Sequence, residues 1–209
     1  MKPRTMIAVA LLSLLVTATP ASAGSVDWSG PMYPMDGTTV VFGEPIQGAK
    51  ATYTNGADAV AFTVDAKQLE ERHGYTIWLM VFNHPENCFG SDAPEGLRCG
   101  QQDHFNPAAM FSVMYGTGKW ANGAAVRFEG TRQANTPLDI PPDVWLGVGL
   151  VNPGGAEVHL RVRDHGPPQG SNADDQVRTI GGGCTQESAP LGPGARGNYQ
   201  CADIHTTAS

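Results

Sequence analysis

Apolar residues that recur at every second position constrain the fold of this chain more than any other feature. The stretch DAVAFTVD, residues 58–65, alternates valine and phenylalanine with small or polar residues, which is typical of a half-buried strand. The preceding TNGAD contains Asn55 and Gly56, a pair that favours a hairpin turn because both residues tolerate positive φ. Short alternating runs of this kind predict strands rather than long helices.

One run differs from the others. YTIWLMVFN, residues 75–83, is apolar on both faces, which predicts a central strand covered on both sides. Further strands are predicted in FNPAAMFSVMYGTG, GAAVRFEG, VWLGVGLV, EVHLRVRDH, QVRTI and CADIHTT, whereas AKQLEERHG, residues 66–74, fits either a short helix or a turn. With roughly eight to ten strands, we predict an all-β, single-domain antiparallel sandwich or barrel with disulfide-tied loops.

The N-terminus predicts export. MKPRTMIAVALLSLLVTATPASA has a basic start, an apolar core over residues 6–16 and an A-x-A cleavage site at residues 21–23. That core is about half the length that spans a bilayer, so a membrane anchor is disfavoured. We predict a signal peptide at residues 1–23 and a single secreted or periplasmic β domain at residues 24–209, without a transmembrane segment.

The charge of the predicted mature domain is strongly acidic. The full chain has 13 Lys and Arg against 20 Asp and Glu, and removal of Lys2 and Arg4 with the signal peptide leaves a formal charge of −9. An acidic surface repels phosphate backbones, so we expect no nucleic-acid partner. No cofactor is expected either, because Gly181–Gly183 lacks the strand–loop–helix context of a phosphate-binding loop.

The four cysteines form two local pairs. Cys88 and Cys99 bracket one Gly- and Pro-rich segment, and Cys184 and Cys201 bracket another. An even number of cysteines in an exported chain indicates disulfides. The competing interpretation, a zinc site, is disfavoured because the sequence contains no C-x-x-C motif. Three connectivities are conceivable, of which we favour 88–99 with 184–201.

The strand AEVHLRVRDH carries polar side chains on alternate positions. Val158, Leu160 and Val162 are predicted to enter the core, and the other face is predicted to be polar and to carry Glu157, His159, Arg161, Arg163 and His165. Two interpretations follow. His159, Arg161 and Arg163 are candidates to bind an anionic or sugar ligand, but a solvent-facing strand with weak cross-strand pairs is the favoured interpretation.

Two Asp-His dipeptides suggest the alternative of a hydrolase or metal-assisted enzyme. Asp103, His104, Asp164 and His165 are the catalytic candidates, since a carboxylate can orient an imidazole. His84, His104 and His165 are weak candidates for a metal site assembled in space, because no pair has metal-ligand spacing. No G-x-S-x-G nucleophile motif is present, and Ser112 is predicted to lie within a strand.

Without these catalytic signatures, we favour a secreted, non-enzymatic binding module or a module associated with the cell envelope. Exposed aromatic residues stack well on sugar rings, so a carbohydrate or envelope component is a candidate partner. The candidate aromatic residues near turns are Trp28, Tyr33, Trp120, Trp145 and Tyr199, although packing at the ends of the sandwich is the favoured explanation for them.

Several phrases resemble those of a group of exported bacterial proteins. They are of the type F-N-x-P-E-x-C, F-N-P-A and H-L-x-x-R-x-H-G-P, and they span roughly residues 74–209. This resemblance implies an exported protein but no particular activity. A weaker similarity to the CHRD (chordin-type) domain, a β-rich extracellular module, involves L-x-x-x-x-x-Y-T-I-W and the histidine-bearing strand. The chain lacks the H-I-H phrase of that domain, so no functional residues are carried over from it.

Overall fold

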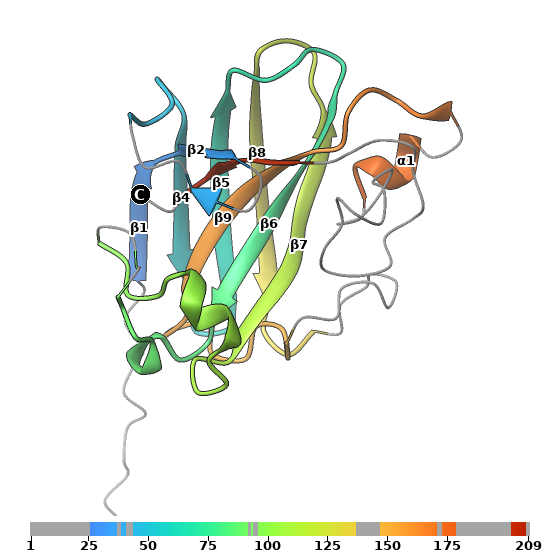
Figure 1. Ribbon diagram of the computed structural model, residues 1–209. Coiled ribbons are helices and arrows are strands. Elements are labelled where there is room, and N and C mark those ends of the chain that lie inside the picture. Colours follow the sequence, from blue (N-terminus) through green and yellow to red (C-terminus); the bar gives the residue numbers. More distant parts are fainter. Residues whose placement is uncertain are drawn as a thin grey trace, which may run out of the picture.

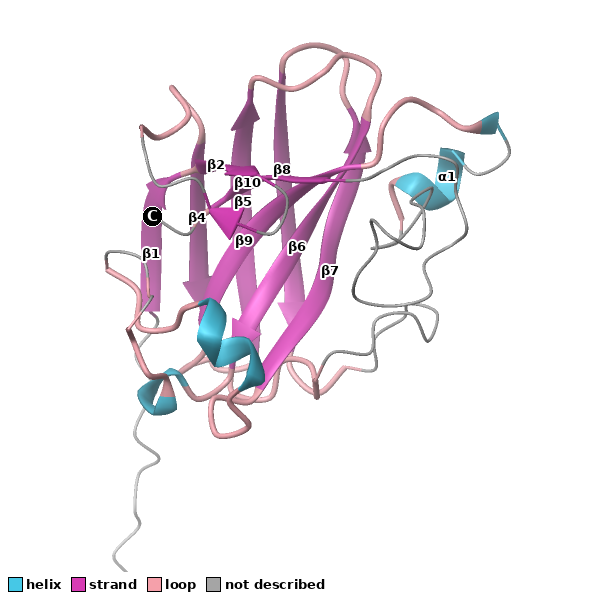
Figure 2. Cartoon of the chain, in the orientation of Figure 1, coloured by secondary structure: helices cyan, strands magenta, loops and turns pink. Residues whose placement is uncertain are grey.

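In a computed structural model, the chain folds into two antiparallel sheets that lie face to face (Figure 1, Figure 2). The structure describes residues 26–36, 39–40, 44–91, 93, 96–136, 147–170, 173–178 and 202–207. The predicted all-β sandwich is confirmed. The predicted signal peptide, Gly181–Gly183, Cys184, Cys201, Trp145 and Tyr199 lie outside the described residues.

Ten strands make up the described part of the two sheets, and all of the pairings between them are antiparallel. The four-stranded sheet has the order β1 (Val26–Pro31), β4 (Lys50–Asn55), β5 (Ala59–Lys67), β8 (Ala125–Gln133). The six-stranded sheet has the order β3 (Thr39–Val40), β2 (Tyr33–Asp36), β10 (Ala202–Thr206), β9 (Glu157–Asp164), β6 (Gly74–Phe82), β7 (Phe111–Trp120).

The main core lies between the sheets and follows the alternation of the sequence. Val60 and Phe62 of β5 pack with Leu79 of β6 and with Val158 and Leu160 of β9 in one buried apolar cluster. The predicted inward direction of Val158, Leu160 and Val162 is therefore confirmed, since all three side chains are fully buried. Burial of this alternating set fixes the register of β9, because a shift by one residue would bring the charged set into the core.

The strand β6 is central, as predicted. It pairs with β9 on one side and β7 on the other, and all nine of its residues are buried. On the face away from the main core, Trp78 and Met80 form a second apolar cluster with Val113. A strand that is apolar on both faces thus has a core on both faces.

The described parts of two predicted strands are not strands, and the segment that fitted either a short helix or a turn is a turn. Residues 147–151 of VWLGVGLV form a loop, in which Gly147 and Gly149 adopt φ of +88° and +81°, incompatible with extended strand geometry. The QVRTI segment begins at Gln176, which is the last residue of the short helix α1 (Ala173–Gln176). The buried side-chain amide of Gln176 donates hydrogen bonds to the carbonyls of His165 and Pro167. Residues 68–73 of AKQLEERHG connect β5 to β6 as a turn.

The hairpin predicted at Asn55 and Gly56 is confirmed, since it joins β4 to β5 and the Gly56 N–H donates to the carbonyl of Ala59. Within the described ranges, no helix has the length and apolar character needed to cross a membrane.

Candidate functional site

One end of the sandwich is closed by a loop that carries a disulfide. The loop leaves β6, passes through the 3-10 helices η1 (Pro85–Asn87) and η2 (Gln101–Phe105), and enters β7 (Figure 1). Cys88 and Cys99 are joined by a disulfide with an S–S distance of 2.07 Å, as predicted. We call this region, residues 83–111 with the adjacent loop 147–152, the disulfide-tied end.

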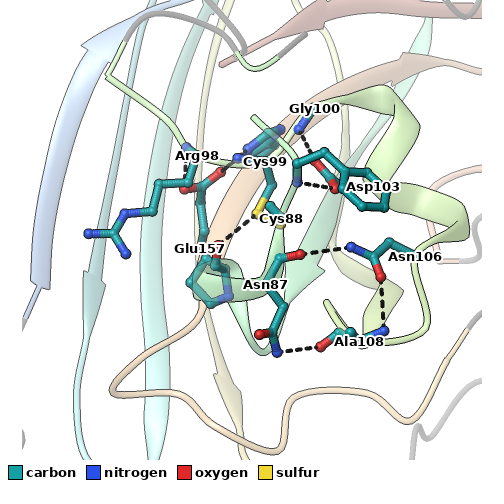
Figure 3. The surroundings of a disulfide bond; sticks show 12 residues. Asn87, Cys88, Arg98, Cys99, Gly100, Asp103, Asn106, Ala108 and Glu157 are labelled. Carbon is teal, nitrogen blue, oxygen red and sulfur yellow. Dashed lines mark hydrogen bonds and ion pairs between the residues drawn. A yellow bond between two sulfur atoms is a disulfide. The ribbon is translucent and has the colours of Figure 1, made fainter. Parts of the chain in front are cut away.

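Asp103 holds the loop together rather than presenting a free carboxylate. It is fully buried, and its Oδ1 accepts a hydrogen bond from the Phe89 N–H at 2.8 Å, while its Oδ2 accepts one from the Gly100 N–H at 2.9 Å (Figure 3). These two bonds link the chain on both sides of the disulfide to η2. The predicted catalytic candidate Asp103 therefore has a structural function in this geometry.

Asn83, the residue that follows β6, connects two loops at this end. Its Nδ2 donates to the carbonyls of Met110 (3.0 Å) and Gly149 (2.8 Å), and its Oδ1 accepts from the N–H groups of Val151 (2.8 Å) and Asn152 (3.2 Å). The side chain is fully buried, and an amide has two donor hydrogens and two acceptor lone pairs. The side chain of Asn83 thus uses its whole hydrogen-bonding capacity to hold Met110 and the loop at residues 149–152 next to each other.

A cavity of about 270 Å³ lies between these two loops. We call it the His104 pocket. Residues 104–107 form one wall, Met110 and Phe111 a second, and Gly147 with Val148 a third. The third wall lies against β7 so closely that a Cβ on Gly147 would be 2.1 Å from Ser112 Oγ, which explains the glycine. Met110 has a φ of 49°, an uncommon conformation for a residue other than glycine.

The pocket is apolar and has exposed apolar residues at its rim. Phe105 is 90 % exposed and Val148 is 61 % exposed. Together with the apolar walls, these two side chains extend the apolar surface of the pocket to its rim, a feature that ligand-binding grooves share.

His104 is the ionisable residue in the wall of this pocket. Its ring stacks on Phe111 with centroids 4.2 Å apart and an interplanar angle of 14°, and it also contacts Phe82. Burial, together with the positive charges of Arg161 and His159, lowers the pKa of His104 from 6.5 to about 4. The imidazole is therefore neutral at pH 7, and within the described ranges no hydrogen bond engages either of its nitrogens.

The polar face of β9 is buried, so the favoured interpretation of a solvent-facing strand was wrong. Glu157, His159, Arg161 and Arg163 are between 3 % and 8 % exposed. The reason is that the disulfide loop covers the start of β9. Oε1 of Glu157 lies 2.9 Å from Nε2 of His159, and the same carboxylate accepts the N–H groups of Arg98 and Cys99 (Figure 3).

These contacts determine the charge state of Glu157. Burial acts to raise its pKa, but the hydrogen bond and charge of His159, together with the N–H groups of Arg98 and Cys99, outweigh burial and hold the pKa below its ordinary value. The buried carboxylate is therefore ionised at pH 7, and it stabilises the attachment of the disulfide loop to β9.

The two candidate arginines lie on the same covered face. The guanidinium of Arg163 lies over the ring of Trp78, 3.8 Å from its centroid, and Arg161 is near enough to act on the pKa of His104. A stacked guanidinium of this kind is a favourable cation–π contact. His159, Arg161 and Arg163 thus lie on one face of β9, but all three are buried, and only the start of this face contacts the disulfide loop through Glu157.

The second Asp-His pair lies at the other end of β9. Nε2 of His165 is 2.7 Å from Oγ1 of Thr76, and the carboxylate of Asp164 is 3.0 Å from Nδ1 of His73. His165 is fully buried. Thr76 and Phe82, the β6 contacts of His165 and His104, are six residues apart, which corresponds to roughly 20 Å along a strand. His104 and His165 therefore cannot bind one metal ion in this structure.

The remaining metal candidate is His84, which lies at the surface of the disulfide-tied end with Nδ1 3.0 Å from Oε1 of Glu86. Among the described residues, the only cluster with metal-ligand distances is Cys88, Cys99 and Asp103, with ligand atoms within 4.8 Å of one another. Its two sulfurs are bonded to each other, and a disulfide sulfur is not the thiolate that binds metals.

The fold and site together define a disulfide-tied β-sandwich with a small apolar pocket at one end. The chain matches no protein-family model, no curated protein and no solved structure. The residue that sequence reasoning missed is Asn83. A signal for it exists, since an amide that directly follows a strand buried on both faces needs partners at a buried position.

Proposed function

We propose that this chain is an exported, non-enzymatic binding domain whose ligand enters the His104 pocket. The observation that carries the proposal is a preformed cavity of about 270 Å³ with an exposed apolar rim at Phe105 and Val148. Ligand sites are usually preformed, concave and mostly apolar, with few polar groups.

The rigidity of the pocket supports this proposal. Its walls are connected through the four hydrogen bonds of Asn83 and through the Cys88–Cys99 disulfide. Walls that are fixed before the ligand arrives reduce the entropy lost on binding. The disulfide also agrees with an oxidising compartment, which the N-terminal segment predicts independently.

A non-enzymatic role is supported by the use of the carboxylates. Both oxygens of Asp103 bind backbone N–H groups, and Asp164 pairs with His73. The enzyme alternative instead pairs Asp103 with His104 and Asp164 with His165, whereas the imidazole that Asp164 contacts is that of His73.

The experiment is an NMR titration of the isotope-labelled protein, purified after export, with two separate probes, benzyl alcohol and N-acetylglucosamine. We expect at least one probe to shift the resonances of His104, Met110 and Val148 in a saturable manner. If neither probe shifts them, or if the shifts lie elsewhere, the proposed site is wrong.

A matched pair of variants localises the binding. Phe105 and Phe89 are both exposed phenylalanines of the disulfide-tied end, but only Phe105 lines the pocket. We expect Phe105→Asp to weaken probe binding at least tenfold and Phe89→Asp to leave it unchanged. Equal effects of both variants would contradict binding in the pocket.

A further inference from the structure

We infer that the His104 pocket selects an uncharged aromatic ring that carries one hydroxyl or amide group. This inference rests on the proposed binding function and specifies its ligand. Three properties of the pocket support it, namely its size, its lining and its charge.

The size of the pocket limits the ligand to one or two rings. A cavity of about 150 Å³ is enough to bind benzene, whereas drug-sized ligands occupy roughly 300–1,000 Å³. The pocket volume of about 270 Å³ lies between these values. A single substituted ring fits inside this volume, whereas most of an oligosaccharide would lie outside it.

The lining favours an aromatic ring over a sugar ring. Phe105, Met110 and Phe111 present π faces and a thioether, both of which contact aromatic rings favourably. A sugar would bring several hydroxyls, and each one buried without a partner is costly. The amide of Asn106, the other polar side chain in the walls, already donates to the carbonyl of Asn87 and accepts from the N–H of Ala108.

The charges near His104 and the apolar walls of the pocket together disfavour ionic ligands. The neutral imidazole offers one N–H donor and one acceptor nitrogen, which suits a single hydroxyl or amide. A cation would meet the positive charge of Arg161, which already disfavours protonation of His104. An anion would be attracted by Arg161, but it would lose its hydration in a pocket whose described walls carry no cationic side chain to pair with it.

The test compares probes of matched size by NMR titration at pH 7: benzyl alcohol, benzylammonium, benzoate, cyclohexylmethanol and N-acetylglucosamine. We expect benzyl alcohol to bind at least tenfold more tightly than each of the other four. If a charged probe, the cyclohexyl probe or the sugar shifts the pocket resonances as strongly, the aromatic inference is overturned while the binding function stands. If none of the probes binds, the proposed function itself fails.

The role of His104 is tested with His104→Phe, which retains a ring on Phe111 but removes both nitrogens. We expect benzyl alcohol to bind threefold to tenfold more weakly to this variant, whereas toluene, which has no hydroxyl, binds equally to both proteins. An equal loss for the two probes would indicate a merely structural role. Phe105→Ala, at a side chain that is 90 % exposed, provides a second variant that should fold normally and weaken both probes.

Discussion

The lowered pKa of His104 predicts that acid destabilises the fold through this one side chain. The pKa is about 4 in the folded protein and 6.5 as the ordinary value, so the unfolded chain binds a proton more readily. Stability is therefore complete above pH 6.5 and is lost as the pH falls toward 4. Linkage gives a loss of about 2 kcal/mol at pH 5 and about 3 kcal/mol at pH 4. These are upper values, because the imidazole retains some contact with water and its charge is partly screened.

The assay is urea denaturation followed by tryptophan fluorescence, at several pH values between 7 and 4, for the wild type and His104→Phe. The variant cannot take up a proton at this position, so its free energy of unfolding should fall less between pH 7 and pH 4 than that of the wild type. The difference between the two proteins should match the losses given above. His84→Phe is the matched control, since it removes an imidazole that lies more exposed at the same end. Parallel pH profiles of the wild type and His104→Phe would refute the argument.

Four further predictions concern the stability of the sandwich. Leu160→Ala should cost about 2–5 kcal/mol in urea melts, as fully buried leucines do, and a cost below 1 kcal/mol would contradict its core position. Asn83→Ala should cost about 2–4 kcal/mol and abolish probe binding, because four backbone groups lose their hydrogen bonds to a buried amide, and intact binding would show that Asn83 does not form the pocket. Replacing both Cys88 and Cys99 by alanine should lower the unfolding free energy by about 3 kcal/mol, given their separation of 11 residues, and an unchanged melting temperature would refute this. Glu157→Gln should destabilise the protein at pH 7 but progressively less in acid, because a carboxylate with a lowered pKa stabilises the fold above its ordinary pKa and loses that effect as the pH falls. A difference from the wild type that stays constant with pH would contradict this.

The sequence predicted the strands whose apolar pattern is complete. The two-sided run of β6 and the inward set Val158, Leu160 and Val162 both follow from the period of two, which assigns each side chain to a face. The Cys88–Cys99 disulfide could be predicted because the two cysteines lie close together in the sequence. In each of these cases the information lies within a few neighbouring residues.

The sequence could not predict whether a polar face is covered. Alternation places His159 and Arg161 on the face opposite Leu160, but only the folded structure shows that this face is also buried. The His104 pocket was missed for a related reason. Its walls come from residues near 105, 110 and 148, and the Asn83 side chain that joins them contacts groups 27 to 69 positions away in the chain.

The position of β10 has a consequence for the order in which the protein assembles. β10 lies between β2 and β9, so that His205 pairs with Pro34, about 170 residues away in the chain. Pairings of such high contact order form late and slowly. Until residues 202–206 arrive, one side of β9 is an open strand edge that can pair with another chain. The docking of β10 is therefore the step at which the chain either completes this sheet or aggregates through the open edge of β9.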